Sequence, residues 1–131
     1  MVVIMADLFS DLTTLALSKG LDGAGTRHKA IAGNIANVET PGYIRQDVSF
    51  EDQLKQALQS PDERLAERSL QAVEPKTQSD MTTPVGPNGN NVSIDKEMAE
   101  LTKNSLQYET MVQLMNMKIS MLQTSISGTV K

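Results

Sequence analysis

The chain has 131 residues, of which 39% are hydrophobic and only 3% aromatic, and it contains no cysteine. These values predict one domain with few large side chains for a globular core, and they exclude disulfides, thiolate metal sites and a cysteine nucleophile. The net charge of −4 argues against nucleic acid as the main partner. The single histidine, His28, argues against a zinc site or histidine-based catalysis.

The negative charge lies in the middle of the chain. Residues 1–37 and 95–131 are each neutral, whereas residues 38–94 carry nine acidic and five basic residues. No apolar run approaches the length of a membrane span, and residues 1–5 lack the basic region of a signal peptide. No phosphate-binding loop, nucleophile elbow or zinc-protease motif is present, so we expect no cofactor, no metal, no small-molecule substrate and no enzymatic activity.

The N-terminal part is predicted to be helical over residues 8–38, because apolar residues recur there at spacings of three and four. Three glycines fall within residues 20–25, and each costs roughly 1 kcal/mol in a helix interior. We therefore expect this helix to be frayed in the lone chain, or to be two short helices joined by a loop at those glycines. His28 is on the apolar track with Ile31 and Ile35, which predicts a packed core or interface side chain.

A signal that ends the helix follows it in the sequence. Pro41 forces the helix to end at or before Glu39, and Pro41-Gly42 fits the centre of a type II turn in which Gly42 has a positive φ. Asn37 suits a left-handed residue at the helix end. Three alternatives are open for the side chains of Asn34 and Asn37, which are fixing helix register, capping the helix and facing solvent.

The middle of the chain is predicted to be short of regular structure. Residues 43–50 suggest an extended segment, and Ser49 with Asp52 resembles a capping box that opens a short helix. Pro61 ends that helix. Residues 60–92 are rich in proline, glycine and small polar residues, which predicts a long mobile loop.

The C-terminal helix is the clearest predicted element. Asp95 is its expected N-cap and Gly128 its expected stop. Between them, apolar residues alternate at spacings of four and three for more than four heptads, as in a coiled coil. A helical hairpin within one chain, without a role in assembly, is the alternative to an assembly seam. The predicted assembly seam consists of Ile31, Ile35, Met98, Leu101, Tyr108, Val112, Met115, Ile119, Leu122 and Ile126.

These elements predict a mainly α protein. Its two long terminal helices are expected to pack as an antiparallel coiled-coil-like pair, joined by a short, partly extended and loop-rich middle segment. The expected divisions of the single domain are residues 1–38, 39–93 and 94–131.

One stretch resembles a known family. The string from Ala30 to Tyr43 is similar to the ANNIANxxTPGY motif near the N-terminus of bacterial flagellar axial proteins, which are the rod, hook and hook-associated subunits. Gly33 stands where that motif often has asparagine. The chain length, residues 89–98 and the C-terminal helix are most similar to the FlgB type of rod protein, with the FlgC type as the nearest alternative. The residues that match the motif are Asn34, Ile35, Ala36, Asn37, Thr40, Pro41, Gly42 and Tyr43.

The resemblance implies a structural subunit of the proximal rod, polymerised through its terminal helices into a drive shaft for motility. It implies export through the flagellar type III apparatus without a cleaved signal peptide, and location in the basal body. The implied partners are further copies of the chain, the rod proteins FlgC, FlgF and FlgG, and the rod-base adaptor FliE. A soluble helical adaptor or export chaperone, and lastly a cell-wall hydrolase, are the alternative functions.

Overall fold

The computed structural model describes the backbone of residues 2–128 and the side chains of residues 12–128. Two long terminal helices dominate the chain, which confirms the prediction of a mainly α protein, and a small two-stranded sheet lies between them in sequence. The elements in chain order are α1 (Val2–Ala36), β1 (Gln46–Ser49), α2 (Glu51–Leu58), α3 (Glu63–Gln71), β2 (Lys76–Ser79) and α4 (Ile94–Ser127).

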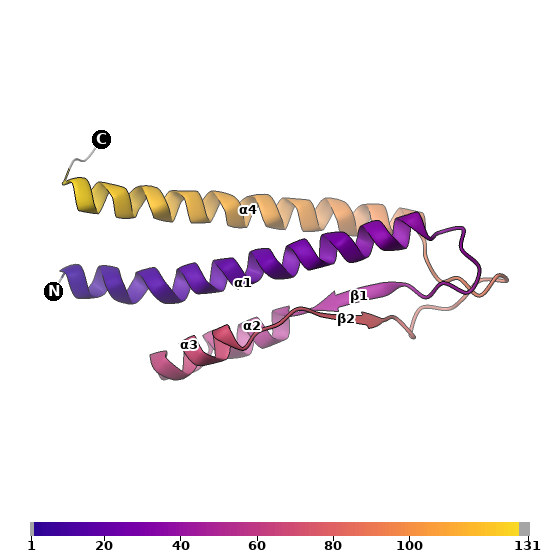
Figure 1. Cartoon of the computed structure of the whole chain (residues 1–131), viewed down its shortest axis with the longest axis horizontal. Helices are drawn as coiled ribbons and strands as arrows, with labels where there is room; N and C mark the ends of the chain where they lie inside the picture. The colour runs from indigo at the N-terminus through magenta and orange to yellow at the C-terminus, as the bar shows by residue number, and fades with distance from the viewer. Residues whose placement is uncertain (1, 129–131) are drawn as a thin grey trace.

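Helix α1 is the central layer of the molecule (Figure 1). Helix α4 lies along one side of α1, and the start of α1 and the end of α4 are at the same end of the pair. The two strands and the helices α2 and α3 lie along the other side of α1. The middle segment therefore folds back onto α1 before the chain enters α4.

The three glycines do not interrupt α1, so the predicted alternative of a loop at residues 20–25 is wrong. Close packing of other side chains against α1 explains why two of these positions are glycine. A Cβ atom on Gly20 would lie 2.6 Å from the sulfur of Met111, and one on Gly23 would lie 2.5 Å from the ring of Phe50. Only glycine allows these side chains to approach the helix backbone so closely.

The turn after α1 has the predicted form. Gly42 has φ +74°, and the backbone N–H of Tyr43 donates to the carbonyl of Thr40 at 3.3 Å, as in a type II turn. The predicted left-handed conformation of Asn37 is wrong, because no residue other than glycine within 2–128 has a positive φ. Its side chain instead donates to the carbonyl of Gly33 at 2.8 Å and so satisfies the last turn of the helix.

The prediction of an irregular loop over residues 60–92 is wrong for part of that stretch, because it contains α3 and β2. Asp62 caps α3 by accepting a hydrogen bond from the backbone N–H of Arg64 at 2.9 Å. Strand β2 pairs antiparallel with β1 from Gln46↔Ser79 to Ser49↔Lys76. The predicted capping box is also absent, since α2 begins after Phe50 and has no side-chain cap.

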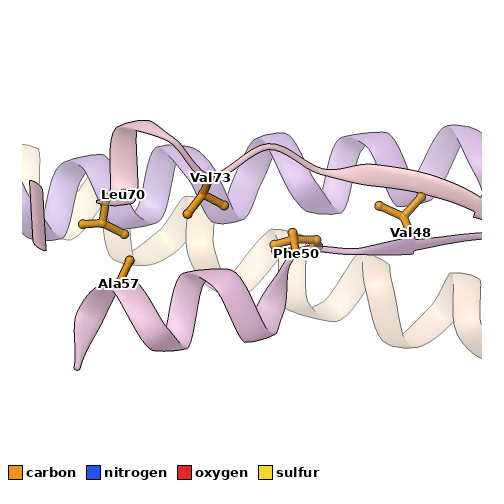
Figure 2. Close-up of a cluster of buried hydrophobic side chains, with 5 residues drawn as sticks. All are labelled: Val48, Phe50, Ala57, Leu70 and Val73. Atoms are coloured by element: carbon orange, nitrogen blue, oxygen red, sulfur yellow. The ribbon is translucent and has the colours of Figure 1, made fainter. Parts of the chain in front are cut away.

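The hydrophobic core lies between α1 and the middle segment (Figure 2). Figure 2 shows side chains from β1, α2, α3 and the segment after α3 gathered under α1. Burying a large aliphatic or aromatic side chain contributes about 1.5–3 kcal/mol, so this cluster fixes the middle segment on α1. The buried core residues are Val48, Phe50, Ala57, Leu70 and Val73, and Leu12, Leu15, Ala16, Ala30 and Leu54 pack against them.

Two basic residues of α1 reinforce this attachment. The ammonium group of Lys19 donates to the carbonyls of Gln71 and Val73, each at 3.1 Å. The guanidinium of Arg27 donates to the carbonyl of Val48 at 2.7 Å and stacks over the ring of Phe50. The N-terminal helix therefore holds the middle segment through both apolar and polar contacts.

Helix α4 ends as predicted, at Gly128 with φ +65°. Its N-cap is Ser93 rather than the predicted Asp95, which lies in the first helical turn together with Glu97. Within residues 2–128, no helix combines the length and the hydrophobicity that crossing a bilayer requires.

Candidate functional site

The side chain of Asn34, in the last turns of α1, joins three parts of the chain. Its Oδ1 accepts hydrogen bonds from the backbone N–H of Gln46 at 2.8 Å and from the hydroxyl of Tyr43 at 3.2 Å. Its Nδ2 donates to the carbonyl of Gln46 at 2.8 Å and to the carboxylate of Glu97 at 3.0 Å. Asn34 is fully buried, and these four bonds use its whole hydrogen-bonding capacity.

Glu97, in the first turn of α4, is a fully buried acid with two partners. One carboxylate oxygen accepts from Asn34, and the other accepts from the Nε of Arg45. A buried carboxylate is stable only when it is paired, so Arg45 is required for this arrangement. Burial acts to lower the pKa of Arg45, but its hydrogen bonds to Glu97 and Asp80 and the charges of Glu97 and Asp47 together outweigh burial, and the pKa is raised.

Asp80 forms a second ion pair with Arg45, in which its Oδ2 lies 3.1 Å from Nη1 of the guanidinium. The same carboxylate accepts hydrogen bonds from the hydroxyls of Thr82 and Thr83, each at 2.6 Å, and from the backbone N–H of Thr82 at 2.9 Å. These bonds, that of the Thr82 hydroxyl first, hold the pKa of Asp80 well below its usual range. The turn that follows β2 is thereby organised around an ionised aspartate.

Two adjacent asparagines before α4 complete the arrangement. Asn90 donates from its amide to the backbone carbonyls of Asn37 and Thr40, each at 2.8 Å. Asn91 accepts from the backbone N–H of Arg45 at 2.6 Å. Both asparagines are buried, so their bonds close the turn after α1 onto the segment that leads into α4.

We call this set the junction network. It connects the end of α1, the motif turn, the start of β1 and the first turn of α4, which lie together at one end of the molecule (Figure 1). Its hydrogen bonds are structural, and no group of three metal-ligating side chains occurs among the residues that the structure describes. The members of the junction network are Asn34, Arg45, Asp80, Asn90, Asn91 and Glu97.

The motif residues have different roles around this network. The hydroxyl of Tyr43 donates a hydrogen bond to Asn34, and the backbone carbonyls of Asn37 and Thr40 accept hydrogen bonds from Asn90. Pro41 and Gly42 are exposed and shape the turn, while Ile35 is half-buried and Ala36 is exposed. Sequence reasoning missed Arg45, Asp80 and the burial of Glu97, although the paired asparagines before a helix were a visible signal.

Known proteins resemble the chain over most of its length. It is 36% identical over 126 residues to the flagellar basal body rod protein FlgB of Bacillus subtilis (strain 168), with 92% of this chain and 97% of that protein covered. It is 34% identical to FlgB of Aeromonas hydrophila, covering 78% and 83%, and 32% identical to FlgB of Escherichia coli (strain K12), covering 78% of each. The chain belongs to the FlgB family of flagellar basal body rod proteins. No protein-family model matches it.

Membership of the FlgB family makes the chain a structural component of the flagellar basal body rod, which confirms the predicted function at that level. The resemblance found in the motif therefore pointed to the right family, and to its FlgB rather than its FlgC type. The junction network is thus part of a rod component, and its task is to hold the two terminal helices and the middle segment in fixed relation.

The predicted assembly seam of this FlgB-family chain is only partly covered. Ile31 is buried, and Ile35, Leu101, Val112, Met115 and Leu122 are half-buried. The exposed members of the seam are Met98, Tyr108, Ile119 and Ile126, with exposed fractions of 49%, 43%, 46% and 86%. His28 is exposed, so the prediction that it packs in a core is not met within the chain.

Other large apolar side chains are exposed on the opposite side of α4 from the seam. Leu106, Leu114, Met117 and Met121 have exposed fractions between 46% and 61%. Isolated exposed apolar residues are ordinary on a protein surface, but many of them along one helix indicate a surface that meets a partner. The C-terminal helix is therefore the candidate assembly surface.

Proposed function

We propose that this FlgB-family chain polymerises through its terminal helices into the proximal rod, where α1 and α4 form an antiparallel coiled-coil-like pair. The exposed apolar residues of α4 carry the proposal, because exposed apolar surface gains free energy when neighbouring chains cover it. The side-by-side placement of α1 and α4, with the start of α1 beside the end of α4, supports the pairing (Figure 1). Heterologous contacts that do not close generate a helical polymer.

The proposed partners are further copies of the chain, the rod proteins FlgC, FlgF and FlgG, the adaptor FliE, and the flagellar type III export apparatus during passage out of the cell without a cleaved signal peptide. The role is structural and not enzymatic. Asp80 and Glu97 lie together at the junction and both form ion pairs with Arg45, which supports a stabilising function for these two acids.

Replacement of an exposed seam residue by an acid tests this function. The variant Ile119→Asp is expected to abolish rod formation and motility, because assembly would bury an unpaired charge at a cost of several kcal/mol. Its melting temperature should stay near that of the parent, since Ile119 is 46% exposed in the single chain. Gln113→Asp, at an exposed polar position of the same helix, is the matched control and should swim normally.

The measurements are swimming assays and electron microscopy of isolated basal bodies. Normal motility of Ile119→Asp would contradict a role of this face in assembly. Light scattering on the purified chain separates the alternative adaptor function, which requires a small closed oligomer instead of open growth.

A further inference from the structure

The segment before α4 contains the only asparagine–glycine pair of the chain, Asn88-Gly89. In such a pair the backbone nitrogen of the second residue can attack the side-chain carbonyl carbon of the asparagine. Glycine hinders this attack least, because it has no Cβ atom. Asn88 is exposed, so solvent water reaches its side chain. The sequence and the exposure are therefore those of a site of spontaneous deamidation.

The reaction balances with water as its only co-reactant. The nitrogen of Gly89 forms a bond to Cγ of Asn88, the bond from Cγ to Nδ2 breaks, and Nδ2 leaves as ammonia with the proton of the Gly89 N–H. Water then opens the resulting five-membered succinimide ring at one of its two carbonyl carbons. Opening at the side-chain carbon gives aspartate. Opening at the backbone carbon gives isoaspartate, in which the main chain continues through the former side chain.

The folded turn holds Asn88 in a conformation that does not form this ring. The backbone N–H of Gly89 donates to the carbonyl of Gly86 at 2.9 Å, and Asn88 has no positive φ, so Pro87 and Asn88 are the centre of a type I turn. The second central residue of that turn has ψ of about 0°, which eclipses the nitrogen of Gly89 with the backbone nitrogen of Asn88. Ring closure requires the Gly89 nitrogen to eclipse Cβ of Asn88 instead.

The motif turn after α1 holds this turn closed. The backbone N–H of Gly42 donates to the carbonyl of Asn88 at 2.9 Å. A Cβ atom on Gly89 would lie 3.4 Å from Cα of Gly42, so the two backbones are in contact. The Oδ1 of Asn88 accepts from the backbone N–H of Asn90, a buried member of the junction network, at 3.2 Å. Rotation of ψ at Asn88 toward ring closure would break the turn bond or the bond from Gly42, so the closed junction opposes the reaction.

We propose that Asn88 is a latent deamidation site, which the closed junction network protects and which reacts when the turns at Gly42 and Gly89 separate or the chain unfolds. The isoaspartate product adds one atom to the backbone. The altered turn then no longer places Gly89 against Gly42 or Asn90 beneath the end of α1, and the junction network stays open in a chain that has reacted. The site lies within one chain, so the proposal is independent of assembly.

Peptide mapping by mass spectrometry measures the reaction. The purified full chain is kept in mildly alkaline buffer, with or without a denaturing concentration of guanidinium chloride, and is digested at intervals. In denaturant, Asn88 is expected to deamidate before every other asparagine. In buffer its rate should be at least about tenfold lower, because the reaction proceeds from the open state. Similar rates in the two conditions, or faster reaction of another asparagine in denaturant, would overturn the proposal.

A pair of variants tests the protection by the junction. Asn90→Ala removes the amide that holds this segment to the end of α1, so the rate at Asn88 in buffer should rise severalfold. Val73→Ala is the control, because it weakens the hydrophobic core instead of the junction and should leave this rate unchanged while circular dichroism shows a folded chain. An unchanged rate in Asn90→Ala, or an equal rise in both variants, would overturn the protective role of the junction.

The isoaspartate product itself tests the consequence. Chains that carry it are separated chromatographically and compared with Asn88→Asp, which has the same added charge on a normal backbone. The isoaspartate chain should unfold at a lower urea concentration than Asn88→Asp, whose carboxylate still accepts from the N–H of Asn90. Equal midpoints would overturn the predicted opening of the junction.

Discussion

Asn34 near the end of α1 donates a hydrogen bond of 3.0 Å to Glu97 at the start of α4, and both side chains are wholly buried. This is a direct polar contact between the two terminal helices, and 63 residues separate its partners in sequence. Because Arg45 neutralises Glu97, the contact also includes the segment that leads into β1. Registration of the long helices thus depends on a buried polar group and not only on apolar spacing, as buried polar residues set register in coiled coils.

Removing the acid at the centre of this contact should destabilise the chain strongly. Glu97→Ala leaves the guanidinium of Arg45 without its buried partner and one N–H of the Asn34 amide without its acceptor. We expect a loss of about 3–5 kcal/mol in the free energy of unfolding, measured by urea denaturation. Asp95→Ala is the control, because it removes an exposed acid from the same helical turn and should cost less than about 1 kcal/mol. Equal losses of unfolding free energy in the two variants would contradict the proposed importance of the junction network.

The depressed pKa of Asp80 predicts an acid sensitivity. Its pKa is lower in the folded than in the unfolded state, so its contribution is complete above the unfolded value, about 3.9, and is lost as the pH falls below it. The stability difference between the parent chain and Asp80→Asn should therefore be constant from pH 7 to about pH 5 and should narrow as the pH falls further. Urea unfolding at several pH values measures it, and a difference that grows on acidification would refute the role of Asp80.

Changing the donors of Asp80 gives an independent check. Thr82→Val with Thr83→Val removes two hydroxyl hydrogen bonds from the carboxylate and keeps the shape of both side chains. The pKa of Asp80 should rise toward its ordinary value, so that acid unfolding begins at a higher pH than in the parent chain. An NMR titration of the Asp80 carboxyl carbon reports this shift without reference to stability.

Part of this structure is predictable from sequence because it depends on local rules. The long helices repeat their apolar period over many residues, and Pro41-Gly42 specifies its turn by backbone sterics alone. Helix α3 was not predicted because its nine residues bury only Ala66 and Leu70, and one helical spacing of four residues is too short a pattern to identify a helix. The burial of Glu97 was not predictable because an acid in a first helical turn is normally exposed, and its partner Arg45 is 52 residues away.

The turn at Gly42 should be sensitive to a branched side chain. Its φ of +74° is strained for β-branched residues, so Gly42→Val should lower stability by about 2 kcal/mol or more and impair rod assembly. Gly33→Ala is the matched control within the same motif. A Cβ on Gly33 would lie 3.8 Å from the Tyr43 hydroxyl, an ordinary contact, so this change should be neutral or slightly stabilising. Calorimetry on both variants decides the matter, and normal motility of Gly42→Val would contradict the turn's importance.

Hydrogen exchange on the dilute chain should reveal an uneven stability along the two terminal helices. The sequence predicted fraying of the first helix at its glycines, but α1 residues between Leu12 and Ala30 pack against the hydrophobic core. Lys19 and Arg27 also donate hydrogen bonds to the middle segment. We therefore expect strong protection of amides in α1 from Leu15 to Asn34. In α4, protection should decline from the buried Asn104 toward Ser127, because few side chains there are covered by the rest of the chain. In isolated rods the C-terminal half of α4 should become protected, as neighbouring subunits cover it. Equal protection along all of α4 in the dilute chain would mean that its apolar face needs no neighbour and would remove the physical basis for assembly through it.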